Sequence, residues 1–108
     1  MQTEKILMAV TVLAAAALAR FRLVDFSGNP AAAGERALGV ANTSYAVGEQ
    51  AGVATHGEIL VEAGAAVAVG AQVESDSVGR AVTLSTGVAF GTARDAATAA
   101  GDIIRVLR

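Results

Sequence analysis

The sequence predicts a mainly β fold, specifically a small β-barrel or sandwich of short strands with a weak internal two-fold repeat and an extended N-terminal segment. Twelve glycines recur about every ten residues, with short runs of β-forming residues between them. Residues 38–54 read as a strand, a small-residue loop, a turn of glycine and an acid, and a second strand. Residues 90–107 repeat this order about fifty positions later. Together these patterns indicate two similar β modules that share one core.

The composition limits both the size of the core and the function classes to consider. A chain of 108 residues corresponds to one domain. It contains no cysteine, which excludes disulfides and thiolate metal sites, and its net charge of −2 argues against nucleic acid as a partner. The hydrophobic fraction is 54% but the aromatic fraction only 4%, so most buried side chains are small. Because small side chains bury little area, we expect the protein to gain stability by association with other chains.

The N-terminal apolar run, residues 6–19, has two interpretations. Lys5 before the run and Ala17-Leu18-Ala19 after it resemble a secretory signal with its cleavage site. Against this, Glu4 cancels the charge of Lys5, and residues 6–12 are rich in β-formers that suit a buried strand. The run is too short for a membrane-spanning helix, which needs about 20 residues. The predicted organisation is an apolar arm or first strand at 1–19 and a single β domain at 20–108, with halves at about 20–57 and 64–108.

Alternation of apolar and polar residues predicts the individual strands. Residues 20–26 read as a half-buried strand, and residues 27–30 as a turn. A strand at 52–56 is expected to break at Gly57, and a second strand at 58–62 to present Glu58 and Glu62 to solvent. Further strands are predicted at 72–75, 80–84, 88–90 and 102–107, the last with Arg105 and Arg108 on its outer face. The alanine-rich stretches 14–19 and 93–100 could instead form short helical turns.

No group of residues in the sequence suggests catalysis. His56 and Glu58 could supply two metal ligands, but no third ligand is evident nearby, and a solvent-facing histidine is the expected state. Glu74 and Asp76 flank a turn, where solvated acids are ordinary. The serines lack the setting of a nucleophile, and the glycine-rich turns lack the ending of a phosphate loop. We therefore predict a protein that is not an enzyme and that uses no cofactor, metal, nucleic acid or membrane.

The order of small motifs resembles the small capsid cement (decoration) proteins of tailed bacteriophages. The matching features are Gly39-Val40-Ala41, the turn at Gly48-Glu49, the glycine at Gly57 after a strand, the A-x-x-x-x-G step at 65–70 and a final strand at 102–107. The resemblance covers about residues 20–107. It departs at the N-terminus, where residues 6–13 are more apolar than the polar start expected of the family.

This resemblance implies a structural virion protein without enzymatic activity. Such a protein binds the outer surface of the expanded capsid and stabilises the shell, as a trimer, with the major capsid protein and copies of itself as partners. Its location would be the outer capsid surface of the virion, after a stage in the host cytoplasm during assembly. We expect capsid or intersubunit contacts from an N-terminal arm that adds a strand to a neighbouring chain. The predicted contact residues are Gln2, Thr3, Glu4, Lys5, Ile6, Leu7 and Met8. The alternative is that residues 6–13 form an ordinary internal strand.

A function from a different class also fits the sequence. Cleavage at Ala19 would release an exported bacterial β-domain that acts as a binding or adhesion module. The intact mass of the protein separates the two hypotheses, because export would remove about nineteen residues.

Overall fold

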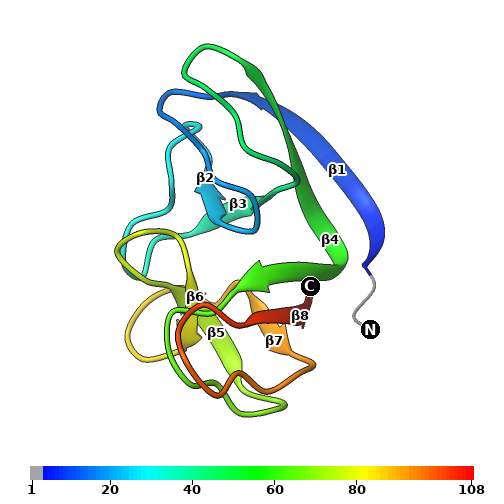
Figure 1. The fold of residues 1–108 in the computed structure, drawn as a ribbon, viewed down its shortest axis with the longest axis vertical. Coiled ribbons are helices and arrows are strands. Elements are labelled where there is room, and N and C mark those ends of the chain that lie inside the picture. The colour runs from blue at the N-terminus through cyan, green and yellow to red at the C-terminus, as the bar shows by residue number, and fades with distance from the viewer. Residues whose placement is uncertain (1–3) are drawn as a thin grey trace.

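The computed structural model describes residues 4–108, which contain eight strands and no helix (Figure 1). The mainly β prediction is therefore confirmed. The strands are β1 (Lys5–Leu13), β2 (Leu23–Asp25), β3 (Ala37–Ala41), β4 (Gln50–Glu62), β5 (Gln72–Ser75), β6 (Ala81–Thr83), β7 (Gly91–Ala93) and β8 (Ile103–Leu107).

All strands belong to one antiparallel, barrel-like sheet whose order is β2-β3-β4-β8-β7-β5-β6, with β1 added on β4. The 13-residue strand β4 connects the two ends of the molecule. Its first part pairs with β1 and β3, and its last part, from Glu58 to Glu62, pairs with β8. Figure 1 shows the result, with β1, β2 and β3 grouped above and β5 to β8 grouped below.

The predicted break at Gly57 is wrong, because β4 continues through this residue. Gly57 has a φ of 118°, and a Cβ at this position would collide with the Lys5 carbonyl oxygen and approach the Leu7 nitrogen. On its other side, its N–H donates to the Arg108 oxygen over 3.2 Å and its carbonyl accepts the Arg108 N–H over 3.0 Å. The glycine thus lets β1 and β8 approach β4 closely, so the strand bends without ending.

Three further segments differ from the sequence prediction. Only Leu23–Asp25 of the strand expected at 20–26 is extended, because Phe21 adopts a φ of 67° and belongs to a turn. The strand expected at 88–90 begins instead at Gly91. The two alanine-rich stretches form loops rather than helical turns, and an isolated bridge holds each of them. These bridges are Leu18 with Tyr45 and Val67 with Ala97.

The apolar N-terminal run is part of the folded sheet. Residues 5–13 form β1, and the residues that follow supply core side chains, since Ala14 is 1% and Leu18 3% exposed. Cleavage after Ala19 would remove a whole strand and two buried side chains. The structure therefore uses this run as a first strand, which disfavours the cleaved-signal interpretation.

Hydrogen bonds occur at matching positions in two parts of the chain, here named the first module (residues 5–57) and the second module (residues 58–108). In each module the loop that follows the first strand bonds to the loop that precedes the last strand and to the end of the strand before that loop. In the first module the donor–acceptor pairs are Ala14 to Glu49, Gly48 to Ala14, Leu18 to Tyr45 and Phe21 to Ala41. The matching pairs in the second module are, in the same order, Ala63 to Asp102, Gly101 to Ala63, Val67 to Ala97 and Gly70 to Ala93. By this correspondence β1 matches the second part of β4, and the first part of β4 matches β8.

The glycine that opens each repeat has a steric explanation. A Cβ on Gly39 would collide with the Ala54 carbonyl oxygen and lie 2.6 Å from Val53 Cγ1. A Cβ on Gly91 would collide in the same way with the Leu107 oxygen and lie 2.9 Å from Val106 Cγ1. Both positions therefore require a residue without a side chain so that the neighbouring strand can pack across the glycine.

Buried apolar residues form two clusters. The larger one fills the second module and extends to Leu23, Val40 and Ala54 of the first. The smaller one lies within the first module and is built mainly from alanine and valine. Its members are Ala14, Leu18, Val24, Ala41, Ala51 and Val53, with Val10, Val12, Leu38 and Tyr45 partly buried against them.

Candidate interaction surface

The predicted contact residues lie at the start of β1, beside the end of β8. Lys5 pairs with Glu58, Ile6 with Gly57 and Met8 with His56, and shifts of register interrupt the pairing between Ile6 and Ala9. Glu4 accepts the Leu60 N–H over 3.0 Å through its side chain. Gln2 and Thr3 lie outside the described residues. Residues 5–13 thus form a strand of their own sheet, as the alternative interpretation proposed.

Four exposed apolar side chains, those of Ile6, Leu7, Met8 and Leu107, lie where β1 and β8 flank Gly57 and Glu58 of β4, and we name them the apolar patch. Leu7 is 83% exposed, Met8 52%, Leu107 46% and Ile6 40%. Leu107 is the residue that sequence reasoning missed, because alternation within residues 102–107 marks it only as a strand residue. Its place beside Leu7 depends on the pairing of β4 with both β1 and β8. Exposed large apolar side chains that gather at one end of a molecule are typical of interaction sites.

The patch borders a cavity of about 380 Å³, lined by Lys5, Leu7, Gly57, Glu58, Leu107 and Arg108. Leu7 and Leu107 supply the large apolar side chains of its wall. The cavity lies where Gly57 draws β1 and β8 toward β4, so the close approach at that glycine shapes the depression.

The outer edge of β1 has no strand partner among residues 4–108. The Ala14 N–H bonds toward Glu49, and main-chain groups alternate between the two sides of an antiparallel strand. The groups of Val10 and Val12 therefore face β4, while those of Ala9 and Thr11 point away from it. An apolar edge whose only charged residue is Lys5 is a template for adding another strand.

The acids on the second part of β4 are not the solvated face that the sequence predicts. The Glu58 side chain is 12% exposed and bonds to Arg94 and to Arg105, the latter over 3.3 Å. Arg105 also bonds to Asp95 over 2.7 Å. The hydrogen bonds that Arg105 donates to Asp95, together with the charges of Asp95 and Glu58, raise the pKa of Arg105 against the opposing effect of desolvation.

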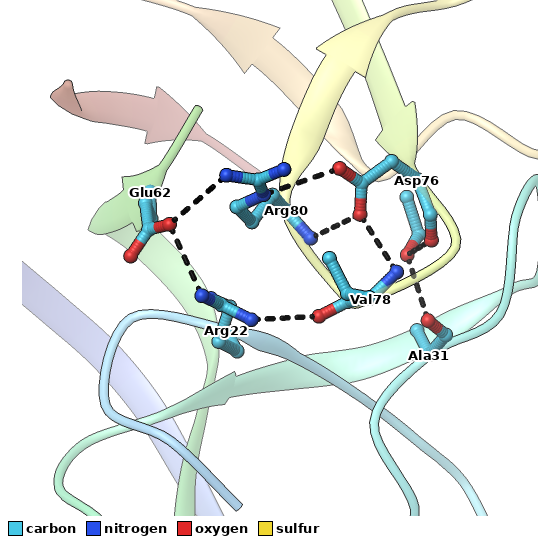
Figure 2. Close-up of polar contacts among 7 residues, drawn as sticks. Arg22, Ala31, Glu62, Asp76, Val78 and Arg80 are labelled. Carbon is cyan, nitrogen blue, oxygen red and sulfur yellow. Dashed lines mark hydrogen bonds and ion pairs between the residues drawn. The ribbon is translucent and has the colours of Figure 1, made fainter. Parts of the chain in front are cut away.

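Glu62 belongs to a second ionic group, which joins the two modules (Figure 2). It bonds to Arg22 over 3.2 Å and to Arg80 over 3.6 Å. Arg22 also donates to the Val78 carbonyl over 3.1 Å, and Asp76 holds the turn by accepting the Val78 and Arg80 N–H groups. We name this group the inter-module clamp. Arg22 and Glu62 therefore fix the relative position of the modules instead of forming open solvated faces.

Arg108 also differs from the prediction, since its guanidinium folds inward. It donates to the Leu38 carbonyl over 2.6 Å and lies 4.7 Å from the centre of the Phe90 ring. Burial, and then the nearby charge of Arg36, lowers the pKa of Arg108. The cation therefore sits beside another cation.

The remaining candidates for chemistry give no catalytic or metal-binding arrangement. His56 is exposed, and its Nδ1 lies 3.1 Å from Thr55 Oγ1. Residues 4–108 contain no group of three or more histidines or acids placed to hold a metal ion. Glu74 is 7% exposed rather than solvated, and it accepts the Ser85 N–H over 2.9 Å. Among the same residues, no helix has the length and apolarity needed to cross a membrane.

Comparison with known proteins decides the family. The family model described as "Phage cement protein" matches residues 1–108, which is the whole sequence. The chain belongs to the phage cement protein family. It is therefore a structural protein associated with the phage capsid, and the resemblance predicted from the sequence is confirmed. A structural, non-catalytic role is typical of this family.

A solved structure shows the same fold. The chain is similar to the head fiber gp8.5 N base in bacteriophage phi29, with a TM-score of 0.77 and 22% sequence identity. The match covers 92% of this chain and 91% of the phi29 chain. No curated protein matches the chain in sequence.

Proposed function

We propose that this cement protein binds the outer surface of the expanded capsid and stabilises the shell, and that the start of β1 faces the major capsid protein. The observation that carries the proposal is the apolar patch of Ile6, Leu7, Met8 and Leu107 beside the open edge of β1. Full burial of a large apolar side chain contributes roughly 1.5–3 kcal/mol of free energy, and these four exposed side chains lack much of that contribution. Docking on the shell would recover part of this free energy, and many weak contacts across a shell would add together.

Co-sedimentation with expanded, undecorated capsids of the phage tests this proposal. The unmodified protein should bind saturably, at a fixed ratio to the shell subunit. Leu7→Asn should weaken binding at least tenfold, because it removes the most exposed apolar side chain of the patch. Val69→Asn is the matched control, since Val69 is 66% exposed but lies in a loop of the second module.

Two results would contradict the proposal. Absence of binding by the unmodified protein would reject the capsid-binding function. Equal binding by the Leu7 and Val69 variants would place the contact on another surface.

We further propose that the protein acts as a trimer, with Phe26 and Leu13 in the subunit contact. Phe26 is 59% and Leu13 55% exposed, at the end of β1 opposite the apolar patch. They are brought close because the Ala15 N–H donates to Gly28, two residues after Phe26, over 3.0 Å. A patch used by all three subunits of a ring must meet a different surface on its neighbour. Sedimentation velocity should give a trimer that Phe26→Asp dissociates, and a monomeric unmodified protein would reject this part.

A further inference from the structure

The cavity beside Leu7 combines an apolar wall with unpaired positive charge. Lys5 and Arg108 both line it. Lys5 has no ion-pair partner in the described part of the chain, and the Arg108 guanidinium, which stacks on Phe90, donates to the main-chain carbonyls of Leu38 and Thr55 and forms no ion pair within residues 4–108. Arg36 adds a further positive charge near Arg108, as the lowered pKa of Arg108 shows.

The acids near the cavity are already engaged. Glu58 bonds to Arg94 and Arg105, and Glu4 accepts the Leu60 N–H. The main-chain oxygen of Arg108 accepts the Gly57 N–H. Among residues 4–108, an incoming carboxylate would therefore find the Lys5 ammonium group without an ion-pair partner, whereas an incoming cation would find acids that already have partners. This local charge opposes the net charge of −2 of the whole chain.

We propose that the cavity receives an aliphatic side chain from an extended, acidic segment of the shell subunit. The aliphatic group packs between Leu7 and Leu107, and a neighbouring carboxylate lies at Lys5. The backbone of the segment can then bond to the free groups of Ala9 along the edge of β1. The inference rests on the proposed function and adds the chemistry of the partner.

A second copy of this chain fits the cavity less well. Apart from Ile6, which belongs to the patch itself, three exposed large apolar residues in the described part of the chain have an acid within two positions, and each of these acids caps the main chain of its own turn. Val47 lies near Glu49, which accepts the Ala46 N–H. Phe26 lies next to Asp25, which accepts the Ser27 and Asn29 N–H groups. Val78 lies near Asp76, which accepts the Val78 and Arg80 N–H groups. Binding through these segments would break the turns that present them.

Two substitutions at the same position separate charge from apolar contact. Leu7→Asp and Leu7→Lys both remove the leucine, and both place a charge at a side chain that is 83% exposed, where the fold should tolerate it. Against expanded, undecorated capsids, we expect Leu7→Lys to bind about tenfold more tightly than Leu7→Asp, because only the aspartate repels an acidic segment. The difference should shrink at about 0.5 M NaCl, where charges are screened over a few ångströms. Lys5→Glu should also weaken binding, relative to Arg20→Glu as a control for charge reversal elsewhere.

The outcomes distinguish this inference from the function on which it rests. Failure of the unmodified protein to bind capsids would reject the proposed function itself. Binding by the unmodified protein, with equal affinities for the two Leu7 variants or a higher affinity for Leu7→Asp, would overturn only the acidic partner. Loss of self-association in both Leu7 variants, seen by sedimentation velocity without capsids, would assign the cavity to a second copy and also overturn the inference. Urea unfolding of each variant checks that the fold is unchanged.

Discussion

The two modules place corresponding side chains in different surroundings. Each of the ten residues of the smaller apolar cluster has a counterpart that belongs to the larger cluster. In the first module four of the ten are only partly buried, whereas all ten counterparts are buried. The first-module residues are Ala14, Leu18, Val24, Ala41, Ala51, Val53, Val10, Val12, Leu38 and Tyr45. Their second-module counterparts are, in the same order, Ala63, Val67, Val73, Ala93, Ile104, Val106, Ile59, Val61, Phe90 and Ala97.

The difference follows from what covers each module. The core of the second module is completed by first-module residues such as Leu23 and Val40, which are 0% and 2% exposed. Within the part of the chain that the structure describes, the first module receives no such cover, and β1 lies at the edge of the sheet. One arrangement of strands can thus serve as a stable core when it is covered and as a surface for partners when it is not. We propose that the chain consists of two copies of one module and that the uncovered copy makes the contacts in the virion.

The largest expected effect comes from filling the space at the repeated glycines. Gly39→Ala should destabilise the protein by about 3 kcal/mol, since its Cβ would collide with Ala54, in the middle of the sheet. Gly91→Ala should cost less, about 1–2 kcal/mol, because its neighbour Leu107 lies at the end of β8 and can move.

Urea unfolding measures both changes. Gly48→Ala is the control, because Gly48 has a φ of 86° but no atom lies within 4 Å of the position that a Cβ would occupy there. It should cost about 1 kcal/mol from backbone strain alone. Equal costs at Gly39 and Gly48 would show that the close strand approach is not what requires glycine.

A matched pair of valines, one in each module, tests whether the second module is more deeply buried than the first. Val61, in the second part of β4, is 0% exposed, and its counterpart Val12 in β1 is only partly buried. Val61→Ala should destabilise by about 2 kcal/mol and Val12→Ala by about 1 kcal/mol or less, as the same two methyl groups are removed from different depths. Equal losses in urea unfolding would mean that β1 is covered in solution, for example by a subunit contact. Repeating the measurement over a range of protein concentrations would then reveal that contact.

A smaller difference in stability cost is expected between alanine substitutions in the two turns that Asp25 and Asp76 cap. Asp25 accepts the Ser27 and Asn29 N–H groups, both over 2.9 Å. Asp76 holds its own turn in the same way and also bonds to Arg80 over 3.3 Å within the inter-module clamp. We expect Asp25→Ala to cost about 1 kcal/mol and Asp76→Ala about 1.5 kcal/mol. A larger cost at Asp25 in thermal or urea unfolding would contradict the added role of the clamp.

The smallest expected effect is a pH dependence at the acid that ends the second repeat loop. Hydrogen bonds from the Thr98 N–H, then the Thr98 hydroxyl and the Ala99 N–H, hold the pKa of Asp102 below its ordinary value of 3.8. A lowered pKa in the folded state means that this stabilisation is present above pH 3.8 and is lost as the pH falls through the lower, folded value.

Asp102→Asn should therefore lower the urea midpoint near neutral pH and leave it almost unchanged in strong acid. Glu49→Gln, at the corresponding loop of the first module, is the control. Glu49 accepts one main-chain N–H, whereas Asp102 accepts two and a hydroxyl. A difference between the unmodified protein and Asp102→Asn that does not shrink as the pH falls below 3.8 would contradict this account.

The local residue pattern was enough to predict the fold class and the family. The spacing of glycines and β-formers predicted a mainly β fold, and the order of Gly39-Val40-Ala41, Gly48-Glu49 and the final strand predicted the family, which the family match confirmed. Residues 72–75 form the predicted strand without change. The division into halves at about 20–57 and 64–108 stays a prediction, and the matched hydrogen bonds suggest that each module also includes a preceding strand.

Tertiary contacts decided the rest. A positive φ at Gly57 usually marks a turn, and only the packing of β1 and β8 against it makes the glycine part of one long strand. Leu107 joins Leu7 in one surface because strand pairing unites residues that are about a hundred positions apart, and no local pattern encodes that pairing. The same holds for Arg22 and Glu62, whose charges predict solvent but whose positions between the modules provide partners. The sequence by itself determined which segments extend and where they turn, and the tertiary structure decided which of them are covered, because cover depends on neighbours brought in by the fold.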